Sequence, residues 1–249
     1  MKKLTIIFLI SLSISFSSCD ILMQVLEEAS TETSLTNSEI IKGLKEALTV
    51  GTGSSVNILN ANDGYFKDNA VKILLPPEAN VIIENIQKVP GLGQKTIDDL
   101  VLRINRSAED AASEAKPIFI DAVKTMTIQD GMTILKGNNT AATTYLKNKT
   151  YTKLVTAFKP KINTSLDKKL VGNISTNKAW TDITTLYNKV APFIGKPKVN
   201  TSLSDYVTRR ALDGLFLKVG DEEKKIRANP LDYVSDIIKK VFGYAKNNK

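Results

Sequence analysis

The chain has 249 residues, of which 34 are lysine or arginine, 26 are aspartate or glutamate and none is histidine, giving a formal net charge of +8 at pH 7. Without histidine the chain lacks the commonest general base and metal ligand, which excludes serine–histidine, cysteine–histidine and the usual zinc chemistries. The lysines are spread along the chain with acidic residues between them, which indicates a solvated surface, so nucleic acid is not an expected partner.

The first nineteen residues resemble a bacterial lipoprotein signal. Two lysines precede an apolar run from Leu4 to Phe16, and Ser17 and Ser18 stand directly before Cys19, the only cysteine. The run of 13 residues is shorter than the roughly 20 that a membrane-spanning helix needs. We therefore expect residues 1–18 to be a signal peptide that is removed, and Cys19 to be lipidated.

The expected location follows from that signal. A lipid on Cys19 would attach the protein to a membrane of the cell envelope, facing the periplasm, and the choice between inner and outer membrane stays open. Residues 19–38 are rich in Glu, Ser, Thr and Asn, a composition typical of a flexible tether. A single cysteine excludes an internal disulfide.

Residues 39–245 are predicted to form a single all-α domain, followed by a polar tail at 246–249. Apolar residues recur at helical spacing and nowhere alternate for long enough to indicate strands. Capping pairs mark helix starts at Thr36, Thr96 and Thr127, and Gly220 is expected to end one helix before another begins. The predicted helices span about 39–59, 77–89, 96–115, 118–126, 128–136, 140–148, 151–171 with an interruption near Pro160, 177–190, 203–219, 221–228 and 231–245.

Residues 86–100 resemble a helix-hairpin-helix, the motif in which a glycine turn approaches a DNA phosphate. The turn is Pro90-Gly91-Leu92-Gly93, and Lys95 follows it. An exported protein does not normally meet the genome, so DNA binding is the least favoured function and a simple turn between packed helices is preferred.

Two groups of charged residues are candidates for a polar network or binding site. The first comprises Asn105, Arg106 and Glu109 beside several alanines, and the second comprises Asp213, Glu223 and Arg227. If the groups met, they would form a buried ionic network or a polar pocket, and a structural role is favoured over a chemical one. No catalytic residue, metal ligand or cofactor is predicted.

Several segments together resemble the bacterial "domain of unknown function 4197" family. They are residues 43–48, 63–66, 105–109, 126–146, 203–230 and 240–243. The resemblance implies an exported, mostly helical protein with no established activity, and no catalytic residue carries over.

Three functions stay open on the sequence alone. A lipid-anchored binding or interaction module is favoured, because residues suited to chemistry are few. A carrier of an apolar ligand would need a large apolar pocket between helices. A carboxylate-based enzyme would need Glu109 or Glu223 in a cleft with a raised pKa.

Overall fold

The computed structural model describes residues 35–85 and 93–247 of the chain. These residues form α-helices, short 3-10 helices and connecting turns, and no strand occurs among them, which confirms the predicted all-α class. Cys19, the signal peptide and residues 86–92 of the glycine turn lie outside the described residues. Within the described ranges, no helix has the length and hydropathy that a membrane span requires.

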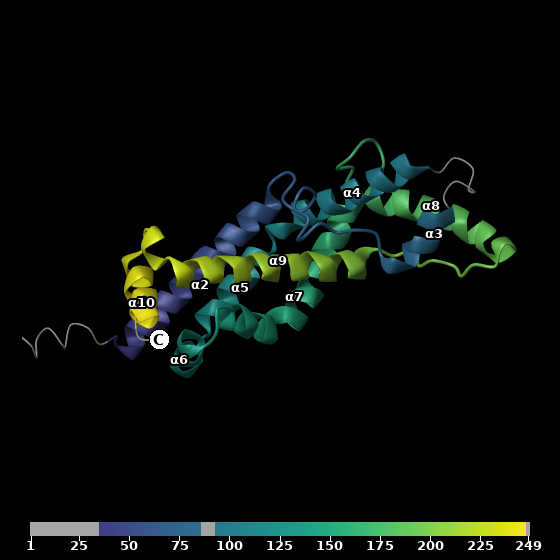
Figure 1. Cartoon of the computed structure of the whole chain (residues 1–249). Helices are drawn as coiled ribbons and strands as arrows, with labels where there is room; N and C mark the ends of the chain where they lie inside the picture. Colours follow the sequence, from purple (N-terminus) through teal and green to yellow (C-terminus); the bar gives the residue numbers. More distant parts are fainter. Residues whose placement is uncertain (1–34, 86–92, 248–249) are drawn as a thin grey trace, which may run out of the picture. The chain divides into compact units, whose positions relative to one another are not determined.

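The elements follow one another in a simple order (Figure 1). They are α2 (Asn37–Asn60), η1 (Pro77–Ala79), α3 (Asn80–Asn85), α4 (Gln94–Ala112), α5 (Ala115–Lys124), α6 (Ile128–Lys136), α7 (Ala141–Asp167), α8 (Thr176–Val190), η3 (Ala191–Ile194), α9 (Ser204–Ala228), η4 (Pro230–Asp232) and α10 (Asp236–Asn247). The compact unit of the fold comprises residues 37–249.

Helices α2, α7 and α9 form the centre of the packing. Helix α9 contacts α7 along much of its length and also contacts α2, while α2 in turn packs against α4, α5, α6 and α10. Figure 1 shows α9 running beside these long helices. The buried face of α9 includes Val207, Ala211, Leu215 and Val219, spaced four residues apart, which places them along one side of a helix.

Large apolar side chains fill the space between these helices. Phe119 of α5 meets Phe216 of α9 edge to face, with ring centroids 5.4 Å apart, and Leu44 of α2 and Leu146 of α7 are fully buried. Each such side chain contributes about 1.5–3 kcal/mol on burial. The shared core therefore joins helices that are far apart in the sequence.

Three predicted helix breaks do not occur. Helix α9 continues through Gly220, where a Cβ would meet a methyl group of Thr143 on α7 at 3.7 Å, an ordinary van der Waals contact, so the position faces α7 but does not require glycine. Helix α7 likewise continues through Pro160, and it joins two segments predicted as separate helices. Buried Phe158 and Ile162 on either side of that proline hold the two halves against the core.

The capping predictions had mixed outcomes. At α6, the Thr127 hydroxyl accepts from the Asp130 amide, and the Asp130 carboxylate accepts from the Thr127 amide, which confirms the capping box. The predicted start of α4 at Thr96 is wrong. That helix begins at Gln94, and the Thr96 hydroxyl instead accepts a hydrogen bond from the amide of Gly93, the residue before the helix.

Candidate functional site

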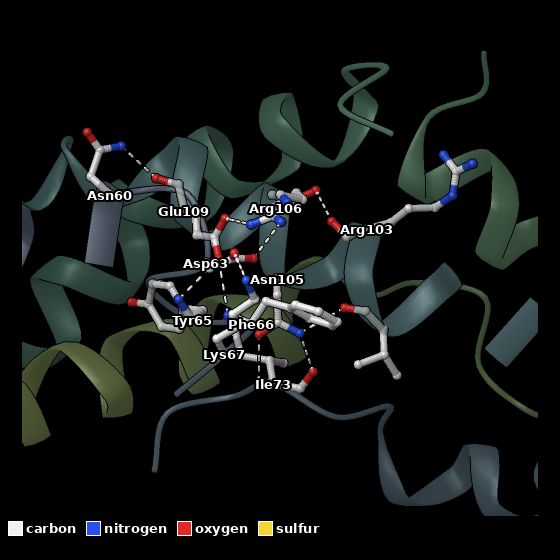
Figure 2. Close-up of polar contacts among 12 residues, drawn as sticks. Asn60, Asp63, Tyr65, Phe66, Lys67, Ile73, Arg103, Asn105, Arg106 and Glu109 are labelled. Atoms are coloured by element: carbon white, nitrogen blue, oxygen red, sulfur yellow. Dashed lines mark hydrogen bonds and ion pairs between the residues drawn. The ribbon is translucent and has the colours of Figure 1, made fainter. Parts of the chain in front are cut away.

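Arg106 lies between two carboxylates. Its Nη1 is 2.6 Å from Glu109 Oε2, one turn along α4, and its Nη2 is 2.6 Å from Asp63 Oδ1 in the segment after α2. Figure 2 shows the guanidinium directed between the two acids. We call Asp63, Asn105, Arg106 and Glu109 the Arg106 network.

Glu109 is saturated by donors from two directions. While Oε2 accepts from Arg106, Oε1 accepts from the backbone amides of Tyr65 and Phe66, at 3.1 Å each (Figure 2). Only 4% of the residue is exposed. A buried carboxylate with three donors is electrostatically neutralised and hydrogen-bonded, so it holds the chain around Tyr65 against α4.

Asn105 fixes the same segment further along. Its side-chain amide donates to the Ile73 carbonyl at 2.8 Å and accepts from the Ile73 amide at 2.9 Å, and it also donates to the Val101 carbonyl. Asn105 is fully buried, and paired polar groups of this kind specify a single arrangement of chain and helix. The Arg106 network thus attaches both ends of segment 63–73 to α4.

The turn that carries Asp63 depends on its backbone. Asp63 has φ +70°, in the left-handed region, and a Cβ at Gly64 would lie 2.2 Å from the Ile58 carbonyl oxygen. Hydrogen bonds from Lys67 and Arg106 hold the pKa of the Asp63 carboxyl below its ordinary value of 3.8. Asp63 is therefore ionised at neutral pH.

A second ion pair joins Glu223 and Arg227, one turn apart on α9. Arg227 Nη2 is 2.8 Å from Glu223 Oε1, and both side chains are only 6% exposed. Glu223 also accepts from the backbone amides of Ala142 and Thr143 and from the Thr143 hydroxyl. We call Glu223, Arg227 and Thr143 the Arg227 network.

The Arg227 network caps two helices at once. The Glu223 carboxylate binds amides in the first turn of α7, where helix donors have no internal partner. Arg227 donates to the Ile134 carbonyl at 2.9 Å, in the last turn of α6, where that oxygen also accepts from the Gly137 amide at the helix end. The pair therefore holds the connection from α6 to α7 against α9.

Asp213 belongs to neither network. It is partly exposed and lies 2.9 Å from Arg210 Nη2 and 3.6 Å from Lys147 Nζ. Ten residues at 100° each leave Asp213 and Glu223 about 80° apart around the helix. The grouping of Asp213 with Glu223 and Arg227 is therefore not observed.

The two networks are also separate from each other. Tyr65, beside Asp63, donates its hydroxyl to the Ala211 carbonyl on α9, whereas Glu223 is 12 residues further along that helix. At 1.5 Å per residue the separation is about 18 Å. The buried pocket that would arise if the charged groups met does not form.

Every pKa shift among the described residues moves the pKa further from 7: carboxyl pKa values are lowered, and those of tyrosine, lysine and arginine are raised. Hydrogen bonds from Thr127 hold the pKa of Asp130 below 3.8, and burial together with the hydrogen bond to Asp130 raises the pKa of Tyr145 to about 12. These residues border a surface depression of about 530 Å³ between α5, α6 and α7, with Lys149 and Lys153. A general acid or base at neutral pH needs a pKa near 7, which neither provides.

The space beside the two networks differs in size. Beside Glu223, a cavity of about 10 Å³ is lined mainly by apolar residues, including Leu44, Val219 and Phe242, and that volume suffices for about one water molecule. Beside the Arg106 network, a depression of about 440 Å³ is lined by residues that include Phe66, Lys72, Leu74 and Ile97. Lys72 Nζ stands 4.3 Å from the centroid of the Phe66 ring.

The helix-hairpin-helix residues are only partly placed. Positions 86–92 lie outside the described residues, and Lys95, the expected phosphate ligand, pairs with Asp99 one turn along α4 at 2.8 Å. In the part of the chain that the structure describes, no group of three or more acidic, histidine or cysteine side chains is placed to hold a metal ion.

Sequence reasoning missed the partners of the predicted residues. In the sequence, Asp63 and Thr143 stand out only as members of segments that resemble the family, and no chemical signal marks either. The positive φ of Asp63 and the clash at Gly64 explain why Asp-Gly occurs there, but the pairing with Arg106 spans 43 residues. No local signal links residues at that separation.

The same segments bear on family membership. Residues 34–243, which include both networks and most of the described helices, match the family described as "Protein of unknown function (DUF4197)". The chain belongs to this family. Searches among curated proteins and solved structures found no match. Family membership agrees with the resemblance drawn from the sequence motifs and leaves the molecular function unknown.

Proposed function

We propose that this member of the family is a lipid-anchored protein of the bacterial cell envelope, facing the periplasm, that acts as a binding module and not as an enzyme. The leader supports the anchor and the location: a basic start, an apolar run too short to span a bilayer, and two serines before Cys19.

The observation that carries the binding role is the saturation of Glu109 and Glu223. Each carboxylate is buried, and both of its oxygens accept hydrogen bonds from backbone amides or an arginine. In both cases the amide donors come from segments distant in sequence. The two residues therefore hold separate segments of the helical body together.

The alternatives have weaker support. A carrier of an apolar ligand would need an enclosed volume of several hundred Å³. The apolar cavity beside Glu223 measures about 10 Å³, and the larger space of about 440 Å³ beside the Arg106 network is a surface depression whose lining includes Lys72 and Asp98. A carboxylate enzyme would need an unsaturated acid in a cleft, and neither candidate has that environment.

The anchor is tested with Cys19→Ala in the native host. We expect the substitution to abolish incorporation of labelled fatty acid and to release the protein from membranes, because the thiol is the acylation point. Ser18→Ala is the matched control, since it keeps a small residue before the cysteine and should leave labelling intact. Undiminished labelling of the Cys19→Ala protein would refute the anchor.

The binding role is tested by mass spectrometry of the full-length protein extracted in detergent. A stoichiometric protein partner supports the binding module. A constant added mass in the lipid range, retained through purification, would instead establish the carrier.

A further inference from the structure

The end of α8 and the residues after it present a large aromatic side chain to solvent. Phe193, in η3, is 88% exposed, and Leu186, seven residues earlier on α8, is also exposed. Seven residues are two helical turns, so the two side chains lie on the same side. We call residues 186–198 the Phe193 tip.

The backbone of the tip is firmly held. Gly195 has φ +64° and donates to the Pro192 carbonyl, while the Asn188 side chain both donates to the Val199 carbonyl and accepts from its amide. These bonds close a tight loop between α8 and the following segment. Phe193 therefore stands at a fixed apex and cannot fold back into the core.

The charges on the Phe193 tip are of one sign. Lys189, Lys196 and Lys198 are exposed and form no ion pair with any described residue, and residues 183–204 contain no acid. The flanking Asp182 and Asp205 pair with lysine or arginine. Glu84 of α3 acts electrostatically on buried Tyr187, but the three unpaired lysines lie within five residues of Phe193 in the chain. An exposed phenylalanine accompanied by unpaired lysines is complementary to an anionic lipid surface.

A second exposed apolar pair provides a comparison within the same protein. Leu231 and Val234 are 76% and 96% exposed, but Asp232 stands between them and the nearby Lys239 pairs with Asp236, so this pair lacks the unpaired lysines that accompany Phe193. They follow the end of α9, whereas the Phe193 tip precedes its start (Figure 1). The 25 residues of α9 separate the two by about 37 Å.

We propose that the Phe193 tip is a membrane-contact site that inserts Phe193 among the headgroups of a bilayer rich in anionic phospholipid, with its lysines on the lipid phosphates. The proposal rests on the proposed function only in that an anchor at Cys19 would bring the tip to a membrane. Residues 20–36, between Cys19 and α2, can span at most about 60 Å, which leaves the helical body free to turn different faces toward the bilayer that holds the anchor.

The test uses tryptophan fluorescence of the full-length protein reconstituted in vesicles. Phe193→Trp keeps an aromatic ring at the apex, and the native Trp180 is buried and serves as an internal control that lipid does not reach. In vesicles of equal parts phosphatidylcholine and phosphatidylglycerol, we expect a blue shift of the added emission and its quenching by brominated lipids. In phosphatidylcholine alone, and in a variant that also carries Lys189→Gln, Lys196→Gln and Lys198→Gln, we expect both signals to be lost.

Leu231→Trp is the matched control, and its added emission should report water in both vesicle types. Three results would each overturn the proposal. The first is quenching at position 231 in place of 193, and the second is equal quenching at position 193 in both lipid mixtures. The third is a spectral shift that follows the density of protein on the vesicles and not the lipid composition. The last result would assign the tip to a second copy of the chain. Repeating the measurement on Phe193→Trp protein that also carries Cys19→Ala separates the tip from the anchor, because the shift should persist without the acyl chains.

Discussion

At the scale of single residues, two arginine–glutamate pairs perform the same task with different partners. Arg106 and Glu109 hold a non-helical segment against α4, and Glu223 and Arg227 hold two helix ends against α9. A buried charge left without its partner is costly, because the desolvation of the remaining ion is no longer offset. Stability is therefore expected to depend strongly on these four side chains.

Glu223→Gln tests that dependence. The substitution leaves Arg227 buried beside a neutral amide and places an NH₂ group against backbone amides, so we expect a loss of about 3 to 5 kcal/mol in the free energy of unfolding. Urea denaturation followed by circular dichroism measures it. Asp221→Asn, on the same helix in an exposed pair with Lys224, should change stability by less than about 0.5 kcal/mol. Equal effects of the two substitutions would contradict the structural role of Glu223.

Asp63 links stability to acid pH. Because its pKa is lowered in the folded protein by Lys67 and Arg106, the folded state binds fewer protons than the unfolded state near that pH. Its contribution is present above the ordinary value of 3.8 and is lost as pH falls through the lowered pKa. Asparagine tolerates positive φ, so Asp63→Asn should keep the turn. The variant should lose less stability than the wild type as pH falls at acid pH, which the midpoints of urea unfolding at each pH would measure. An unchanged acid limb would show that Asp63 is not responsible.

At the scale of elements, the contact between α2 and α10 depends on a missing side chain. A Cβ at Gly43 would lie 2.6 Å from Val241 Cγ2, so the two helices approach as closely as glycine permits. Gly53, ten residues further along α2, has nothing within 4 Å of the same position. Packing against α10 therefore requires glycine at position 43 of α2, whereas no contact requires it at position 53.

Alanine at these two positions should have opposite effects. Gly43→Ala forces α10 away and should destabilise the protein by about 1 to 3 kcal/mol. Gly53→Ala removes backbone freedom from the unfolded chain at no steric cost and should stabilise it by about 0.5 to 1 kcal/mol. Thermal or urea unfolding compares them, and a stabilising Gly43→Ala would show that α10 does not pack there as described.

At the scale of the whole molecule, the described residues from Asn37 onward form one compact unit around α2, α7 and α9. Contacts join α2 near the start of the unit to α10 near its end, and Lys240 reaches Glu39 at 2.7 Å. Because each long helix contributes to the same core, partial unfolding would expose apolar surface on several others. Cooperative unfolding is the expected consequence.

Trp180 allows that cooperativity to be measured. It is the only tryptophan, is 1% exposed, and its indole donates to the Asn200 carbonyl at 3.1 Å. Its emission in urea should shift to the red in the same transition in which circular dichroism reports the loss of helix. Two separated transitions would show that α8 unfolds independently of the other helices.

The sequence by itself determined the all-α class, the capping box at Thr127 and the family, because each depends on spacing within a few residues or on ordered motifs. Local rules failed at Gly220 and Pro160, where a residue that weakens an isolated helix is overruled by packing on α7 and α9. Only the tertiary structure decided which charges meet. Arg106 binds Asp63, 43 residues away in the chain, and Glu223 binds an amide of α7, 80 residues away. Helix packing brings these donors and acceptors together, and periodicity along the chain does not encode that proximity.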